Sequence, residues 1–175
     1  MNSHAIAWLF IIFMVNFSTD YVFKKGKMME QNITWEQGEY WVTTDKTKFD
    51  IHFVHNNLTQ LYWACGITLE KVRTGIEHSL CFALFHCDKE IGFARLITDF
   101  STFAYLCDVF IVPDYQKRGL GRWLVECVLQ HPIISHVKRV MLVTSSAGGL
   151  YEKFGFEPVR VQDFVWTLEK TKVSE

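Results

Sequence analysis

Several patterns that would assign a function at once are missing from this sequence. It has five cysteines, an odd number, and no two of them form a C-x-x-C pair. Such a set indicates neither a zinc site nor a disulfide framework and is typical of buried, reduced thiols in a cytoplasmic protein. The formal net charge is −1, whereas a general nucleic-acid-binding protein is normally basic. We therefore expect a cytoplasmic protein that does not bind nucleic acid.

The histidines do not complete a metal site in the sequence either. His86 precedes Cys87, and His52 stands near His55. A zinc site needs three or four protein ligands at regular spacing, and no further ligand follows these pairs at such a spacing. We therefore interpret them as ordinary histidines and expect no metal.

No apolar run in the sequence has the length of a typical membrane-spanning helix. Residues 5–15 are continuously apolar, but a membrane-spanning helix needs about 20 such residues. No Lys or Arg precedes the run and no small-residue cleavage site follows it, so it is a poor secretory signal. A packed extra element, a membrane-proximal segment and an extension outside the native protein all stay open. We separate residues 1–28, the apolar N-terminal extension, from one folded domain over residues 29–175.

The composition and periodicity of that domain predict an α/β fold. Hydrophobic residues make up 49% of the chain and aromatic residues 15%, which allows a substantial core. Alternating and apolar runs predict strands, and caps and helical periodicity predict helices. The expected strands are residues 35–44, 80–87, 91–98, 103–112, 139–144, 157–160 and 164–168, with a short extended piece at 51–54. The expected helices are residues 58–64, 68–78, 120–130 and 146–154.

The most informative segment spans residues 109–122. An apolar strand ends at Pro113, and a short polar turn containing Gly119 and Gly121 opens directly into a helix. Such a strand–loop–helix directs backbone N–H groups and the positive end of the helix dipole at one spot, which suits a pyrophosphate. Three cations flank the turn: Lys117, Arg118 and Arg122. The glycine spacing fits neither a Walker A loop nor a dinucleotide-binding fingerprint.

Two motifs then point to one family. Gln-x-x-Gly-x-Gly, at residues 116–121, resembles the acyl-CoA pyrophosphate loop of the GNAT superfamily of N-acyltransferases. Residues 147–156, A-G-G-L-Y-E-K-F-G-F, are similar to the A-x-x-L-Y-x-K-x-G-F segment of that superfamily. The motifs occur in the family's order, and neighbouring stretches look like an uncharacterised bacterial branch. The resemblance implies a mixed, mostly antiparallel central sheet flanked by helices and splayed at two parallel strands, with residues 29–175 as an N-acetyltransferase domain.

The resemblance also implies a reaction. An acetyl group would pass from acetyl-CoA to a primary amine of a small molecule or a protein, with no metal. Two sets of residues are expected to bind the cofactor. The pantetheine arm and the thioester would contact the main chain of Val109, Phe110, Ile111 and Val112. The pyrophosphate would contact Gln116, Lys117, Arg118, Gly119, Leu120, Gly121 and Arg122. A homodimer is common in the family and is an expectation here.

Two residues are the expected catalytic groups. Tyr151 aligns with the family's usual tyrosine and, with an ordinary phenol pKa near 10, could protonate the leaving thiolate; the alternative is a tyrosine that only packs on the core. Asp108 could deprotonate or anchor the acceptor amine, or could brace a neighbouring loop. Strand alternation predicts that residues 106, 108, 110 and 112 share one face.

The acceptor site is the least family-like part. Tyr62, Trp63, Phe85 and Tyr105, with Phe103, could form an aromatic acceptor pocket, or could belong to the core. Two functions of other classes stay open beside the enzyme: a non-catalytic acyl-CoA sensor and a membrane-tethered interaction module that uses the apolar N-terminal run.

Overall fold

The computed structural model describes residues 32–159 and 165–166. The chain divides into two units, residues 1–31 and 32–175, and every described residue lies in the second. The apolar N-terminal run is therefore outside the described residues. Within them, no helix is both long and apolar enough to cross a bilayer.

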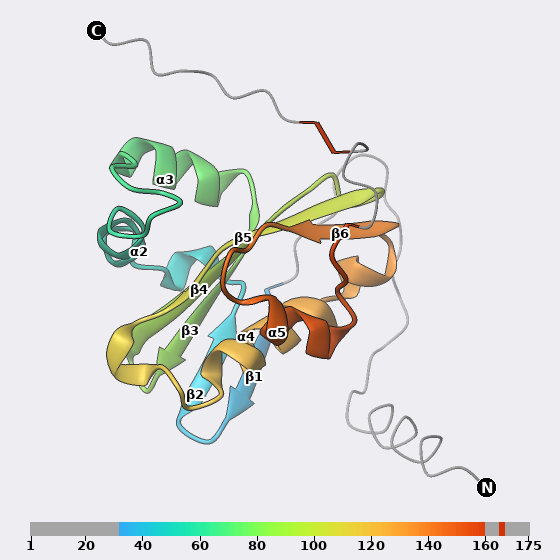
Figure 1. Cartoon of the computed structure of the whole chain (residues 1–175). Helices are drawn as coiled ribbons and strands as arrows, with labels where there is room; N and C mark the ends of the chain where they lie inside the picture. Colours follow the sequence, from blue (N-terminus) through green and yellow to red (C-terminus); the bar gives the residue numbers. More distant parts are fainter. Residues whose placement is uncertain (1–31, 160–164, 167–175) are drawn as a thin grey trace, which may run out of the picture. The chain divides into compact units, whose positions relative to one another are not determined.

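A six-stranded sheet forms the centre of the second unit (Figure 1). Its strands lie in sequence order, β1 to β6. Neighbours from β1 to β5 pair antiparallel, and β6 pairs parallel to β5. The strands are β1 Thr34–Gln37, β2 Tyr40–Thr43, β3 Leu80–His86, β4 Lys89–Thr98, β5 Phe103–Ile111 and β6 Arg139–Leu142. The predicted mixed and mostly antiparallel sheet is confirmed.

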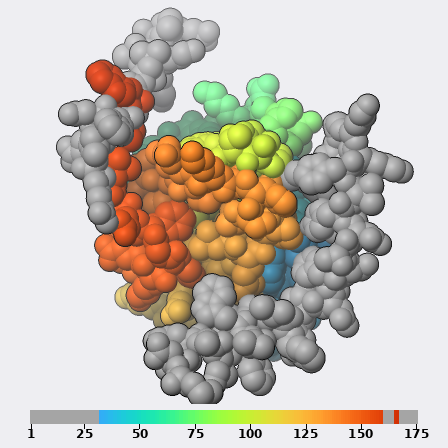
Figure 2. Space-filling model, turned by 90° about the vertical axis from the view of Figure 1, so that its right-hand side faces the viewer, coloured from blue at the N-terminus to red at the C-terminus, as the bar shows by residue number. Residues whose placement is uncertain are grey.

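Helices cover both faces of the sheet, each over its own hydrophobic cluster. On one face, α2 Ile51–Leu58 and α3 Leu69–Glu77 pack on Phe85, Phe93 and Phe110. On the other, α4 Leu120–Gln130 and α5 Gly148–Tyr151 pack on strand residues such as Phe82 and Leu106. Short 3-10 turns complete the description: η1 Lys46–Lys48, η2 Pro113–Tyr115, η3 Pro132–Ser135 and η4 Glu152–Phe154. Figure 2 shows the surface on the side of α4 to α5, in orange to red.

The N-terminal elements differ from the prediction in two places. Residues 35–44 form a hairpin, because Gly38 turns the chain with a φ of 62° between β1 and β2. The segment predicted to be extended at residues 51–54 is the first half of α2. The Asp50 carboxylate accepts hydrogen bonds from the amides of His52 and Phe53, a strong N-cap that starts the helix earlier. Residues 58–64 therefore contain its end and the following turns.

The remaining elements agree closely with the prediction until the end of the sheet. Thr68 caps α3 as expected, and α4 has the predicted bounds. The predicted buried strand at residues 139–144 is the shorter β6, and its neighbour Val143 is 79% exposed. Of the predicted final strand pair, residues 157–159 and 165–166 are described and form no strand, while residues 160, 164, 167 and 168 lie outside the described residues. Among the described strands, β6 pairs with β5 alone.

A buried carboxyl group fixes the start of α2 to the sheet. Glu90, near the start of β4, is 6% exposed, and its Oε2 accepts a hydrogen bond of 2.8 Å from the Asp50 amide. Its Oε1 is buried without a hydrogen-bond partner among the described residues. Burial raises the pKa of Glu90 from 4.5 to about 8, although the Asp50 amide acts in the opposite direction. The carboxyl group is therefore protonated in the folded protein at neutral pH.

This burial predicts a pH-dependent stability. Between pH 5 and pH 8 the unfolded chain has lost the Glu90 proton while the folded protein keeps it, so the free energy of unfolding falls as the pH rises and levels off above about 8. In Glu90→Gln this contribution is absent. We expect urea denaturation to show that the free energy of unfolding of the variant, relative to that of the wild type, rises by on the order of 2–4 kcal/mol from pH 5 to pH 8.5. The exposed Glu36→Gln variant is the control, and a constant difference between wild type and Glu90→Gln would contradict the prediction.

Candidate active site

The loop between β5 and α4 presents a row of free backbone amides. The first amide of α4 that donates within the helix is that of Trp123, to the Gly119 carbonyl. The amides of residues 117–122 have no hydrogen-bond partner in the described part of the chain. Lys117 and Gly119 are left-handed, with φ values of 62° and 82°, which is typical of an anion-binding nest. The loop can therefore receive an anion at the positive end of α4.

Open space surrounds these amides, and side chains hold the loop in place. A Cβ at Gly119 would meet no atom within 4 Å, and one at Gly121 would only touch Ile111, at 3.7 Å. Gln116 does not point at the amides: its Nε2 donates to the Ile111 carbonyl at 2.8 Å. Arg118 donates to the Asp114 carbonyl at 2.7 Å. The exposed side chains of Lys117 and Arg122 remain as charges beside the loop.

The two parallel strands separate just before this loop. Their pairing ends at Leu106 and Leu142, where β6 stops, while β5 continues to Ile111. From Cys107 to Ile111, the β5 edge that faced β6 has no strand partner among the described residues. The main chain of Val109 to Ile111 thus lies at an open edge that leads to the amide loop, whereas the Val112 amide donates to the Ile91 carbonyl and the Val112 carbonyl accepts from the Tyr115 amide. The predicted splay of the parallel strands is confirmed.

A bulge in β5 changes which side chains face which side of the sheet. Cys107 pairs with Arg95 and Phe110 with Phe93, so Asp108 and Val109 together lie opposite the single residue Ala94. Asp108 has a φ of 55°, as a bulged residue can. The prediction that residues 106, 108, 110 and 112 share one face is therefore wrong: Leu106 packs in the cluster under α4 and Phe110 in the cluster under α2 and α3.

Asp108 forms an ion pair with Arg95. Its Oδ2 accepts a hydrogen bond of 2.6 Å from Arg95 Nε, and the side chains are 12% and 20% exposed. Burial lowers the pKa of Arg95, but the Asp108 carboxylate, together with Cys107 and Cys81, outweighs this effect, so the pKa of Arg95 is raised. Arg95 also donates to Ser79 Oγ at 3.3 Å. The guanidinium group packs against Gly75 in α3, where a Cβ would lie 3.5 Å from Arg95 Nη1, an ordinary van der Waals contact.

The pair forms the polar wall of a small cavity beneath α2 and α3. The cavity has a volume of about 20 Å³, enough for one water molecule. Its other lining residues are mostly apolar: Val54, Leu58, Ile67, Lys71, Val72, Gly75, Ile76 and Phe93. Nearby, burial and then the Asp108 carboxylate raise the pKa of Cys107 to about 12, so this thiol is not a nucleophile at neutral pH.

Tyr151 combines a packed ring with a reachable hydroxyl. The residue is 8% exposed, and its ring contacts Phe156 edge to face at 5.8 Å. Its hydroxyl has no hydrogen-bond partner among the described residues, yet it is not among their fully buried, unpartnered polar atoms, so it reaches solvent. Burial raises the pKa of Tyr151 above its ordinary value of 10. The phenol is therefore protonated at neutral pH, the predicted packing on the core is confirmed, and a role as general acid stays a prediction.

The four predicted acceptor residues do not form one pocket. Tyr62 and Trp63 are 69% and 47% exposed and contact each other at 4.9 Å; the Tyr62 hydroxyl is 2.5 Å from Ser145 Oγ in the loop after β6. Phe85 is 5% exposed and stacks on Trp41 at 4.1 Å, which gives it a packing role. Tyr105 lies on β5 near the ion pair, and burial, with Cys107 and Asp108, raises its pKa.

Comparison with known proteins identifies the family that this geometry belongs to. Residues 77–158 match the model of the acetyltransferase (GNAT) domain. A solved GNAT-family protein from Xanthomonas campestris pv. campestris is 38% identical, superposes with a TM-score of 0.73, and is matched over 77% of this chain and 95% of its own. The chain belongs to the GNAT acetyltransferase family.

Other relatives extend this GNAT assignment. A candidate acetyltransferase from Gibberella zeae is 28% identical over 141 residues, which are 68% of this chain and 79% of the relative. A GNAT acetyltransferase from Elizabethkingia anophelis, solved with acetyl-CoA bound, shares the fold at 14% identity and a TM-score of 0.55, over 69% of this chain and 78% of that one. Because relatives come from fungi as well as bacteria, a bacterial branch stays a prediction.

Sequence reasoning missed Arg95 and Ser145. Arg95 is the one charge within the apolar run at residues 91–97, and Asp108 is its counterpart in the next strand. Opposite charges in adjacent apolar strands would have been a usable signal. No signal in the sequence connects Tyr62 with Ser145, since 83 positions separate them.

The Arg95–Asp108 pair should contribute measurably to stability. Removing one partner leaves the other charge half-buried and unpaired. In a double-mutant cycle of Arg95→Met, Asp108→Asn and the double variant, we expect each single change to cost about 1–3 kcal/mol and the coupling energy to be at least about 1 kcal/mol. Urea denaturation measures all four proteins. Strict additivity would show that the two side chains do not interact.

Proposed function

We propose that this GNAT protein transfers an acetyl group from acetyl-CoA to a primary amine by direct attack on the thioester. One observation carries the proposal: the unpartnered amides of residues 117–122, at the end of a strand edge left open by the splay. An array of this kind fits a pyrophosphate followed by an extended chain of amides. The acetyl-CoA held by the relative from Elizabethkingia anophelis supports the same choice of cosubstrate.

The loop and the strand edge would bind different parts of acetyl-CoA. The amides from Lys117 to Gly121 would hold the pyrophosphate, with Lys117 and Arg122 adding charge. The open main chain of β5 at Val109 to Ile111 would pair with the amides of the pantetheine arm and donate an N–H to the thioester carbonyl, where negative charge develops. The side chains of Gln116 and Arg118 fasten the loop to Ile111 and Asp114, and the Arg118 amide stays among the groups that would bind the pyrophosphate.

Tyr151 is the proposed general acid. The amine nitrogen attacks the carbonyl carbon, the carbon–sulfur bond breaks, and its electron pair goes to sulfur. Tyr151 donates its hydroxyl proton to this thiolate. A phenol with a raised pKa stays protonated until the thiolate forms, and its solvent-reaching hydroxyl leaves a path by which it can recover a proton.

Asp108 is proposed to anchor the acceptor amine and to brace the bulge of β5. Its Oδ2 is committed to Arg95, and Oδ1 can still attract an ammonium group at the open edge of β5. Through the bulge, the same residue sets the direction of the Val109 amide. The proton lost by the attacking amine then passes to solvent. Among the aromatic residues, Tyr62 and Trp63 are the proposed acceptor contacts, since they are exposed next to the loop that follows β6.

Binding and turnover test the proposal together. We expect calorimetry to show one molecule of CoA bound per chain. Gly121→Ala should lower the affinity by about tenfold or more, equivalent to 1.4 kcal/mol, because a Cβ intrudes beside the amides. Gly149→Ala in α5 is the control, since a Cβ there meets nothing within 4 Å. An absence of CoA binding would overturn the proposal, and binding without thiol release across an amine panel would identify an acyl-CoA sensor.

Replacing Tyr151 separates chemistry from packing. Tyr151→Phe keeps the ring against Phe156 but removes the proton, so kcat should fall by about 100-fold or more while CoA affinity and stability stay unchanged. Tyr40→Phe, on β2 and away from β5 and β6 in the sheet, is the matched control. Thiol release under saturating amine measures kcat, and an unchanged value would remove Tyr151 from the mechanism.

A further inference from the structure

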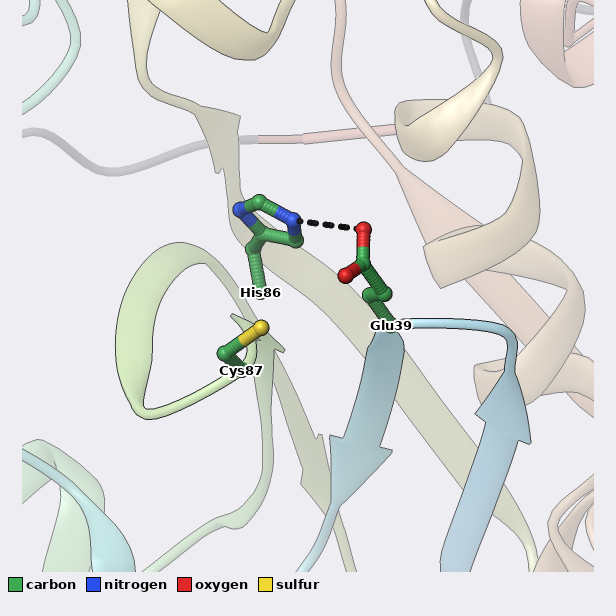
Figure 3. A group of neighbouring side chains, drawn as sticks. All are labelled: Glu39, His86 and Cys87. Carbon is green, nitrogen blue, oxygen red and sulfur yellow. Dashed lines mark hydrogen bonds and ion pairs between the residues drawn. The ribbon is translucent and has the colours of Figure 1, made fainter.

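Three metal-binding side chains of different chemistry meet at the end of the sheet that carries the β1–β2 and β3–β4 turns. Glu39 lies in the first turn, His86 is the last residue of β3, and Cys87 follows it. One donor atom from each lies within 4.8 Å of the other two. Figure 3 shows the three side chains converging on one point, with Glu39 reaching across from the neighbouring hairpin.

The backbone under these residues is firmly held. The Cys87 amide donates to the Glu39 carbonyl at 2.8 Å, and the Cys87 carbonyl accepts from Trp41 Nε1 at 2.7 Å. Cys87 itself is left-handed, with a φ of 50°. These bonds lock the two turns together, so the three side chains start from fixed positions and need only rotate to meet.

A neighbouring tyrosine orients the imidazole. His86 Nδ1 is 3.1 Å from the Tyr115 hydroxyl, and Nε2 is 3.5 Å from Glu39 Oε2. The ring also stacks on Tyr40, with centroids 4.8 Å apart. If Nδ1 donates its proton to Tyr115, the lone pair of Nε2 faces Glu39. Metal-binding histidines are usually oriented by such a second hydrogen bond.

We propose that Glu39, His86 and Cys87 form a binding site for Zn²⁺, with water as the fourth ligand. Thiolate, imidazole and carboxylate are the donors that Zn²⁺ prefers, whereas Mg²⁺ and Ca²⁺ require oxygen alone. A tetrahedral ion with bonds of 2.0–2.3 Å needs donors about 3.3–3.8 Å apart. The His86 and Glu39 donor atoms are already 3.5 Å apart, so rotation of the Cys87 and Glu39 side chains has to supply a contraction of at most about 1 Å. The Cys87 thiol releases its proton to solvent on binding.

The proposed site is independent of acetyl transfer but adjoins the cosubstrate loop. Tyr115 ends η2, and the row of free amides begins two residues later, at Lys117. The Arg118 guanidinium carbon lies 5.0 Å from the centre of the Tyr115 ring. The hydrogen bond from His86 to Tyr115 therefore connects the zinc ligands to the segment that leads into the loop.

Zinc titration of the chelator-treated, tag-free full chain tests the proposal. We expect one Zn²⁺ per chain with a Kd on the order of 1 µM, weaker than a four-ligand zinc finger. Cys87→Ser and His86→Gln should each weaken binding by about 100-fold, and Tyr115→Phe by about 10-fold through lost orientation. Cys65→Ser, which removes another exposed thiol, should leave the affinity unchanged.

Cobalt spectroscopy identifies the ligands directly. Co²⁺ in the wild type and in Cys65→Ser should give a sulfur-to-cobalt charge-transfer band with intense tetrahedral d–d bands, and Cys87→Ser should lose the charge-transfer band. Glu39→Gln, whose side chain is 77% exposed, provides a ligand variant that does not disturb folding, and circular dichroism checks the others. The proposal is overturned if Zn²⁺ does not bind, or if binding survives unchanged in Cys87→Ser, His86→Gln and Glu39→Gln.

Discussion

The ion pair between Arg95 and Asp108 underlies the geometry of the whole site. It joins β4 and β5 at the point where β5 carries its extra residue, and each of the two largely buried charges neutralises the other. An unpaired charge at this depth would be costly, so the pair also fixes the bulge. Beyond the bulge, Phe110 turns to the α2–α3 face, while Val109 and Ile111 pack toward α4.

The open edge of β5 follows from where the neighbouring strand ends. β6 stops at Leu142, and Thr144 then accepts a hydrogen bond from the Ala147 amide at 3.0 Å, which turns the chain into α5. That short helix places Tyr151 in the cluster shared with α4. The early end of β6 thus exposes the main chain of β5 and lets α5 place Tyr151 nearby. The family assignment rests on the same region of the fold.

Sequence reasoning succeeded where the signal was local. The helical periodicity at residues 120–130 and the two motifs gave the parallel crossover, the amide loop and the family correctly. It failed where one residue outweighed a pattern or where contacts were distant. The Asp50 cap turned an apparent extended piece into α2. The Arg95–Asp108 pair depends on a bulge that strand alternation does not reveal. Glu39 meets His86 only because two hairpins adjoin, and no local pattern in the sequence connects the two residues.

The two tethers of the amide loop have a kinetic consequence. Gln116 and Arg118 already fasten the loop to Ile111 and Asp114. The loop therefore loses its conformational entropy during folding, and little of it has to be ordered when the ligand binds. Capture of a diphosphate should then be limited by diffusion and charge attraction, with salt slowing arrival far more than it hastens departure. If the loop had to rearrange before binding, salt would change the dissociation rate more than the association rate.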